Sequence, residues 1–194
     1  MSIRPAQPRD HEQIARICRL TGATGEDATG LFSNDTTLSD VYATPYLHGP
    51  ATFCLIWDVD GEARGYVLGT SDTRAFQTWF VDEWWPSRAE IHPIRAAGDE
   101  WLIPAAADPH RMLIAQLNDY PAHLHIDLLP DQQGRGAGRQ LIEAATSFAA
   151  SGGAPGIHLV AEKANAGAQA FYPRVGFVAV SEDDASVTFA RHLP

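Results

Sequence analysis

The part of this chain best suited to chemistry is a turn with three glycines at alternate positions, Gly134, Gly136 and Gly138. Before it, His123 to Leu129 predicts a strand with a largely apolar alternate face, and after it apolar residues recur at helical spacing from Leu141 to Ala149. The free backbone N–H groups and the dipole at a helix N-terminus attract phosphate, and residues without a Cβ let it approach closely. Because Arg135 and Arg139 add positive charge, the sequence predicts a pyrophosphate-binding turn.

Two common phosphate-binding motifs do not fit this turn. A nucleotide-triphosphate P-loop needs a Lys followed by Ser or Thr, and no such pair follows here. The dinucleotide fingerprint Gly-x-Gly-x-x-Gly would need a glycine where the chain has Arg139. It would also need several further strand–helix units, whereas only 194 − 138 = 56 residues remain after Gly138.

The turn instead resembles the core motif Gln/Arg-x-x-Gly-x-Gly/Ala of the GCN5-related N-acetyltransferase (GNAT) family, and the segment Gln133-Gly134-Arg135-Gly136-Ala137-Gly138 fits it at every position. A second segment is similar to the one that follows in that family, because Asn165 and Ala168 precede Tyr172 and a closing Gly176-Phe177. The run from Tyr120 to Pro130 and the Trp-rich middle of the chain further resemble bacterial relatives of the acetyltransferase-like C-terminal domain of O-GlcNAcase.

The resemblance implies an α/β fold of the GNAT type, in which helices flank a mixed, curved central β-sheet within a single domain, 1–194. Segment 71–120 is Trp-rich and is not explained by the generic family, so we expect an insertion on the acceptor side. Its tryptophans either pack an accessory subdomain or form an aromatic cage for a substrate. Within it, 73–84 and 110–117 are expected to be helical.

The remaining elements follow from apolar periodicity and turn residues. Strands are expected at Ser2–Pro5, Ala51–Val59, Arg64–Thr70, Ile157–Ala161, Phe177–Val180 and Ser186–Ala190. Helices are expected at Asp10–Leu20 and, as a short one, near Asp27–Phe32. Asp60-Gly61 predicts a tight hairpin between the second and third strands.

The resemblance also implies how acetyl-CoA binds. The backbone around Leu128 would pair with the pantetheine arm, the pyrophosphate would occupy the glycine turn, and Asn165 would bind the pantetheine amides, while Arg174 would reach a cofactor phosphate. The implied cofactor-binding residues are Leu128, Leu129, Gln133, Gly134, Arg135, Gly136, Ala137, Gly138, Arg139, Asn165, Tyr172 and Arg174.

Tyr172 matches the family position whose hydroxyl protonates the departing coenzyme A thiolate. A phenol titrates near pH 10, so it stays protonated at neutral pH and can give a proton to a thiolate whose acid has a pKa of about 8.5. The alternative role for Tyr172 is packing at the end of a short helix.

The general base is harder to identify. Some relatives carry a glutamate where this chain has Ala122, which cannot accept a proton. His123, His125 and Asp127 alternate along one strand and would project from one face, unless a bulge alters the parity. Asp127 or His125, directly or through water, is the candidate base, and structural hydrogen bonding is the alternative. The His-x-His pair lacks identifiable further ligands, so we expect no metal.

Acetyl transfer to an amine of a small molecule or a lysine is the first functional hypothesis. The second is a catalytically weak or inactive module that binds acetyl-CoA or coenzyme A, because the usual glutamate is missing and a fold does not guarantee chemistry.

Composition limits the partners. Asp and Glu outnumber Lys and Arg by 24 to 14, which disfavours nucleic acid. No window is apolar enough for a membrane span or a signal peptide, so we expect a cytoplasmic protein that does not bind membranes. Cys18 and Cys54 lie in apolar contexts and are expected to be buried thiols. The expected partners are acetyl-CoA and an amine acceptor, with homodimerisation suggested by the family.

Overall fold

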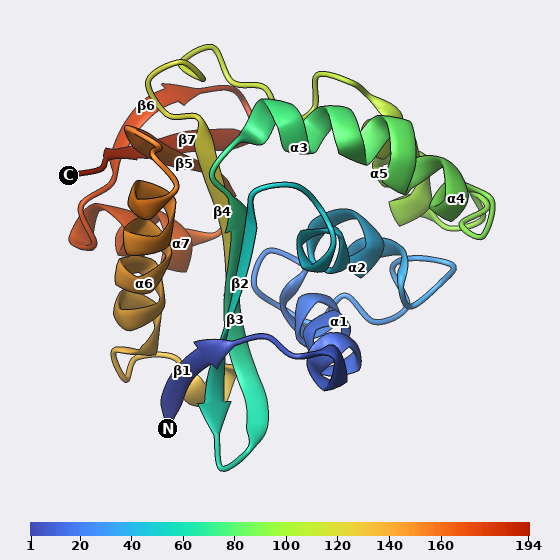
Figure 1. The fold of residues 1–194 in the computed structure, drawn as a ribbon. Coiled ribbons are helices and arrows are strands. Elements are labelled where there is room, and N and C mark those ends of the chain that lie inside the picture. Colours follow the sequence, from blue (N-terminus) through green and yellow to red (C-terminus); the bar gives the residue numbers. More distant parts are fainter.

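The computed structural model describes all residues, 1–194, and is built on one seven-stranded sheet (Figure 1). The strands lie in the order β1-β2-β3-β4-β5-β7-β6. Their bounds are β1 (Ser2–Pro5), β2 (Thr52–Val59), β3 (Glu62–Thr70), β4 (Ala122–Leu128), β5 (Gly156–Glu162), β6 (Val178–Glu182) and β7 (Ser186–His192). Only β4 and β5 run parallel to each other, so the sheet is mixed.

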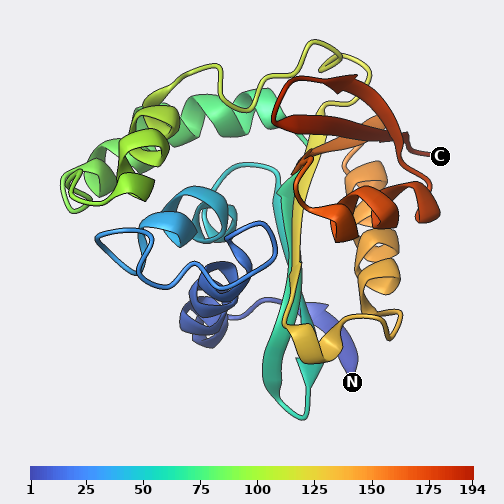
Figure 2. The ribbon, with the colours of Figure 1, turned by 180° about the vertical axis from the view of Figure 1, so that it is seen from behind.

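Helices cover both faces of the sheet, as the two views in Figure 1 and Figure 2 show. One face carries α1 (His11–Thr21), α2 (Thr37–Tyr42), α3 (Thr73–Trp79), α4 (Trp85–Ala89) and α5 (Ala97–Ala107). The other face carries α6 (Ala137–Ser151) and α7 (Ala166–Arg174). A π-helical turn, 80–84, joins α3 to α4, and short 3-10 turns occur at 8–10, 44–47 and 130–132. The expected mixed, curved sheet between two helical layers is therefore confirmed.

The hairpin between β2 and β3 follows from two residues. Asp60 and Gly61 have φ angles of 55° and 90°, both in the left-handed region that a two-residue hairpin turn of this hand requires. Val59 and Glu62 pair directly across the turn. This part of the sheet therefore forms as the Asp-Gly sequence predicts.

Side-chain alternation along β4 divides the interior into two hydrophobic cores. Leu124 and Ile126 pack with α6 residues such as Leu141. His123 and His125 lie on the opposite face, where they contact residues from other segments. Because the pairing of β3 with β4 is regular, without a bulge, the predicted parity of the polar side chains on β4 holds.

The parallel strands β4 and β5 separate soon after they begin. They pair only at Ala122 with Ile157 and at His123 with His158, although each strand has seven residues. Beyond those pairs the backbone edges of both strands are free of each other. This separation opens the sheet toward the glycine turn.

Two helix predictions are wrong. Segment 110–117 forms turns, in which the His110 N–H donates to the Asp108 side chain and the Met112 N–H to the Gln77 side chain rather than to helical carbonyls. Residues 27–32 also form turns and bends, since Gly30 has a φ of 83° that ends any helix there.

The helix α5 was not expected from the sequence. Its start depends on Asp99, whose carboxylate accepts hydrogen bonds from the N–H groups of Arg95 and Ala96 and from the hydroxyl of Ser33. Ser33 lies 66 residues away in the chain, so a tertiary contact completes this cap.

Candidate active site

A cleft of about 730 Å³ lies between the end of β4, the start of α6 and α7. The glycine turn forms one end of it. Gly134 and Gly136 have φ angles of 71° and 84°, and nothing lies within 4 Å of the place where a Cβ would sit on either. Gly138 has a different role, because a Cβ there would come within 3.0 Å of the Phe171 ring. Two glycines therefore keep the turn open and one permits close packing of α6 against α7.

Most of the expected cofactor residues line this cleft. They are Leu128, Gln133, Gly134, Gly136, Gly138, Arg139, Asn165, Tyr172 and Arg174. Three others do not. Leu129 is buried and its N–H donates to the Arg64 carbonyl at 3.0 Å, Ala137 is buried in the core beneath α6, and Arg135 is exposed outside the cleft.

The backbone of β4 presents alternate residues to the cleft. Since the Leu129 N–H points to β3, the N–H and C=O groups of Leu128 and Ile126 point the other way, to the edge that β5 has left. The Gln133 side chain already donates to the Leu128 carbonyl at 3.0 Å. Ile126 is thus a cleft residue that sequence reasoning missed, although strand parity points to it.

Two side-chain contacts fix α7 beside the turn. The Asn165 side chain accepts a hydrogen bond from the Ala168 N–H at 2.9 Å and so caps α7, which leaves its NH₂ group for a ligand. The Arg139 guanidinium donates to the Arg174 carbonyl at 2.7 Å, and the Arg174 side chain is exposed.

Tyr172 lines the cleft from α7 and is almost fully buried. Its ring packs against Phe177 and Phe189, while its hydroxyl makes no hydrogen bond within the protein. Burial raises the pKa of this phenol, and the nearby Asp127 charge raises it further. The hydroxyl is therefore protonated at neutral pH and free to donate.

A second cavity, of about 900 Å³, lies on the other side of the β4 end. Only Thr24 and Asp127 line both cavities, so the two meet at these residues. The Asp127 carboxylate accepts a hydrogen bond from the Tyr66 hydroxyl at 2.6 Å. Burial raises the pKa of Asp127 above its usual value, although the hydrogen bond from Tyr66 opposes the shift.

A hydrogen-bond chain sets the protonation of the histidines behind Asp127. The Thr73 hydroxyl donates to the Pro121 carbonyl, so it accepts from His123 Nδ1–H at 2.8 Å. His123 Nε2 then accepts from the Tyr46 hydroxyl at 2.6 Å, and His125 Nε2–H donates to the Tyr46 oxygen at 3.0 Å. This leaves His125 Nδ1 as an unprotonated acceptor on a residue that lines the second cavity.

Burial and the charge of Arg111 lower the pKa of His125 to about 3. His123 lies on the same side of the sheet. Burial lowers its pKa well below the ordinary value, and the neighbouring histidines lower it further. Both rings are neutral at physiological pH.

Comparison with known proteins shows which family the chain belongs to. The model of the acetyltransferase (GNAT) family matches residues 24–177. The chain belongs to the GNAT family. Acetyl-CoA is accordingly its cosubstrate.

Solved structures agree with the family. The protein SsHAT is 36% identical, with a TM-score of 0.89 over 98% of this chain and 97% of that one. A GCN5-related N-acetyltransferase from Kribbella flavida is 16% identical, with a TM-score of 0.60 over 99% and 97% of the two chains. The PaiA N-acetyltransferase from Thermoplasma acidophilum, solved in complex with coenzyme A, is 14% identical, with a TM-score of 0.59 over 98% of each chain. The last two share only the fold at this level of identity.

The second cavity of this GNAT protein has aromatic walls. Tyr42 contacts His125 edge to face, and Phe32 contacts Trp101 in the same way. Trp101 is 52% exposed, whereas Trp84 and Trp85 are buried in the core shared with α1 and α2. Packing therefore accounts for most of the Trp-rich segment, and Trp101 alone faces the cavity as a cage residue would.

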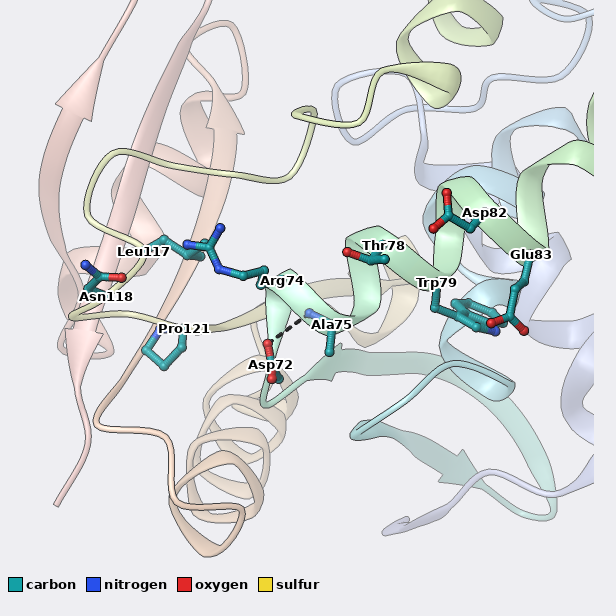
Figure 3. A pocket seen from close by; sticks show the side chains of 10 residues that line it. All are labelled: Asp72, Arg74, Ala75, Thr78, Trp79, Asp82, Glu83, Leu117, Asn118 and Pro121. Atoms are coloured by element: carbon teal, nitrogen blue, oxygen red, sulfur yellow. Dashed lines mark hydrogen bonds between the residues drawn. The ribbon is translucent and has the colours of Figure 1, made fainter.

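A third hollow lies along α3 (Figure 3), and it shares no lining residue with the other two cavities. It is polar, with Asp72, Arg74 and Asp82 among its lining residues, and the Asp72 side chain caps α3 by accepting from the Ala75 N–H. It contains none of the expected site residues of the GNAT protein.

No helix in the structure is both long and apolar enough to cross a membrane. No cluster of three or more His, Cys, Asp or Glu side chains is arranged to hold a metal ion. Cys18 is buried and Cys54 is partly buried, and both are free thiols.

Proposed function

We propose that this GNAT protein transfers the acetyl group of acetyl-CoA to a primary amine by direct attack on the thioester. The observation that carries the proposal is the position of Asp127, which lines both the cofactor cleft and the second cavity. An amine that enters from the second cavity meets the cofactor cleft at this carboxylate. The second cavity is thus the acceptor cavity.

Asp127 is the better of the two candidate bases. Its raised pKa makes it a stronger base than an ordinary aspartate, whereas the pKa of His125, about 3, makes that imidazole a very weak one. His125 Nδ1 can accept a hydrogen bond from the amine and orient its lone pair. Asp127 takes the proton that the amine nitrogen loses as its bond to the carbonyl carbon forms.

The other steps use groups in the cofactor cleft. The Leu128 N–H, on the free edge of β4, is placed to stabilise the oxyanion of the tetrahedral intermediate. When the carbon–sulfur bond breaks, the Tyr172 hydroxyl gives its proton to the thiolate. The phenolate then regains a proton from solvent.

A catalytically weak coenzyme A-binding module is the alternative. It is supported by Ala122, which is buried on the opposite face of β4 and supplies no base, and by the resemblance of 120–130 to the acetyltransferase-like domain of O-GlcNAcase. Turnover separates the two functions.

Further expectations concern the whole chain. We propose that 1–194 is one domain and that 71–120 is an acceptor-side insertion, since this segment brings Trp101 and Arg111 to the acceptor cavity. Cytoplasmic location, homodimerisation and the absence of nucleic acid, membrane and metal partners stay predictions.

The test is calorimetric titration with acetyl-CoA followed by thiol release against a panel of amines, for the native protein and for D127N. We expect D127N to bind acetyl-CoA normally and to lose about 100-fold or more in kcat/KM, because general-base catalysis contributes about 10²–10⁴-fold. The matched control is D119N, which changes an exposed aspartate outside both cavities. Binding without release by the native protein would favour the coenzyme A-binding module, and equal rates for D127N would exclude Asp127 as the base.

A further inference from the structure

Arg111 is a cation without a partner inside the acceptor cavity. It comes from the loop between α5 and β4, and it is the only Lys or Arg residue that lines this cavity. Its Nε and Nη2 atoms are buried and make no hydrogen bond, and the guanidinium forms no ion pair. Two of the three guanidinium nitrogens thus lack a hydrogen-bond partner within the protein, which is unfavourable for buried polar atoms.

The acids near Arg111 are engaged elsewhere. Asp127 accepts from the Tyr66 hydroxyl, and Glu162 accepts from the Thr24 hydroxyl at 2.6 Å. His125 and His123 are neutral, so they supply no negative charge. The nearest faces of the guanidinium are aromatic, with its central carbon 5.4 Å from the Tyr42 ring centroid and 5.0 Å from that of Phe80.

We propose that the acceptor is a primary amine that also carries a carboxylate, and that Arg111 binds this carboxylate. The proposal rests on the proposed acetyl transfer, since it names the substrate class of that site. The guanidinium is a planar set of donors with a permanent positive charge, which can hold a carboxylate through charge-assisted hydrogen bonds. The amine then lies toward Asp127 and His125, which line the same cavity.

The rest of the cavity fits such a molecule better than a phosphorylated one. A phosphate would bring about two negative charges close to the carboxylates of Asp127 and Glu162, against one compensating arginine. Tyr42, Phe32 and Trp101 line the same cavity and provide apolar walls for a side chain. The acceptor class is therefore an amino acid with an apolar or aromatic side chain.

The test compares kcat/KM for L-phenylalanine, L-leucine and their carboxamides, which lack the carboxylate charge. The native protein should prefer each acid over its amide by about 10- to 100-fold, as expected for a charge-assisted pair of hydrogen bonds. In R111M this ratio should fall to about one, and R111K should restore part of it because it keeps the charge and loses the fork. The control R74M changes an exposed arginine on α3 (Figure 3) and should keep the native ratio.

A binding measurement keeps the inference separate from the proposed transfer. Thermal stabilisation of the coenzyme A-loaded protein by 3-phenylpropanoate, compared with 3-phenylpropanamide, needs no turnover. Stabilisation by the acid alone, lost in R111M, supports the carboxylate site even where no amine is acetylated. Equal effects of acid and amide, or a preference that survives in R111M, would overturn it. R111M should fold, because it removes a buried unpaired charge.

Discussion

The cofactor cleft and the acceptor cavity meet at Asp127, but they are built from different kinds of groups. The cleft depends on backbone N–H groups, glycines and helix ends from one continuous segment of the chain, 126–175, together with a few residues near Thr24. The acceptor cavity depends on large side chains from α1, α2, α5 and the 111–114 loop as well as from the sheet. A site built from backbone groups suits a cosubstrate that does not vary. A site built from side chains can be altered by substitution without disturbing the sheet.

The titratable groups are divided in the same way. Asp127 and the neutral histidines lie on the acceptor side of β4, while the cofactor side offers one phenol, Tyr172, and exposed arginines. The proposed acid, Tyr172, lines only the cofactor cleft, whereas the proposed base, Asp127, also lines the acceptor cavity. This makes the comparison testable one side at a time.

The largest expected effect is on the cofactor side. In G136V, a β-branched residue replaces a glycine at φ 84° and a side chain enters the open turn. We expect the affinity for coenzyme A to fall at least about 100-fold, because two or more charge-assisted hydrogen bonds of about 1.5–3 kcal/mol each are lost. Calorimetric titration measures this.

The control for G136V is G153V at the end of α6. Gly153 has a φ of 83°, also with nothing within 4 Å of its Cβ position, but it lies outside the cleft. Both variants should lose about 1–2 kcal/mol of stability through the same backbone strain. If G136V still bound coenzyme A as G153V does, the glycine turn would not be the cofactor site.

A smaller effect is expected for the proposed general acid, Tyr172. Y172F keeps the ring that packs on Phe177 and Phe189 and removes the free hydroxyl. We expect kcat to fall about 100-fold, the range of general-acid catalysis, with little change in affinity for acetyl-CoA. Stopped-flow thiol release measures the chemical step.

The control for Y172F is Y120F. The Tyr120 hydroxyl contacts His192 at 3.1 Å and lines neither cavity. An unchanged rate in Y172F would assign Tyr172 to packing alone and would leave thiolate protonation to solvent.

The last prediction concerns stability and lies on the acceptor side. The pKa values of His125 and His158 are lowered to about 3 and about 4, and that of His123 is also well below 6.5, in each case mainly by burial. Below pH 6.5 the unfolded chain binds protons at these histidines that the folded protein does not bind. The free energy of unfolding should therefore fall as the pH drops from about 6.5 to about 4, by about 1.4 kcal/mol per pH unit for each histidine.

Urea unfolding followed by tryptophan fluorescence measures this slope. Asp127 opposes it near the lower end of the window, because its raised pKa lets the folded state take up a proton above pH 3.8. H125Q should reduce the slope by the share of one histidine. A free energy that does not change over this window would mean that the histidines are hydrated rather than buried.

Local sequence determined the cofactor side. The glycine turn, the strand before it and the helix after it are consecutive, so their backbone geometry follows from residues close in the chain. Asp60-Gly61 fixed its hairpin and Asn165 its helix cap for the same reason. The regular register of β4 also kept His123, His125 and Asp127 on one face, as alternation predicts. These features specify the family and its sheet.

Only the tertiary structure decided the acceptor side. Nothing local to Arg111 shows that its charge is unpaired beside Tyr42, or that Tyr46, 77 residues from His123, fixes the protonation of both histidines. The cap of α5 by a contact with Ser33 and the loss of a helix at 110–117 have the same origin. Side chains from distant segments acquire their partners, burial and charge only after the chain has packed. Local sequence therefore determined the cofactor cleft, and packing determined the acceptor cavity.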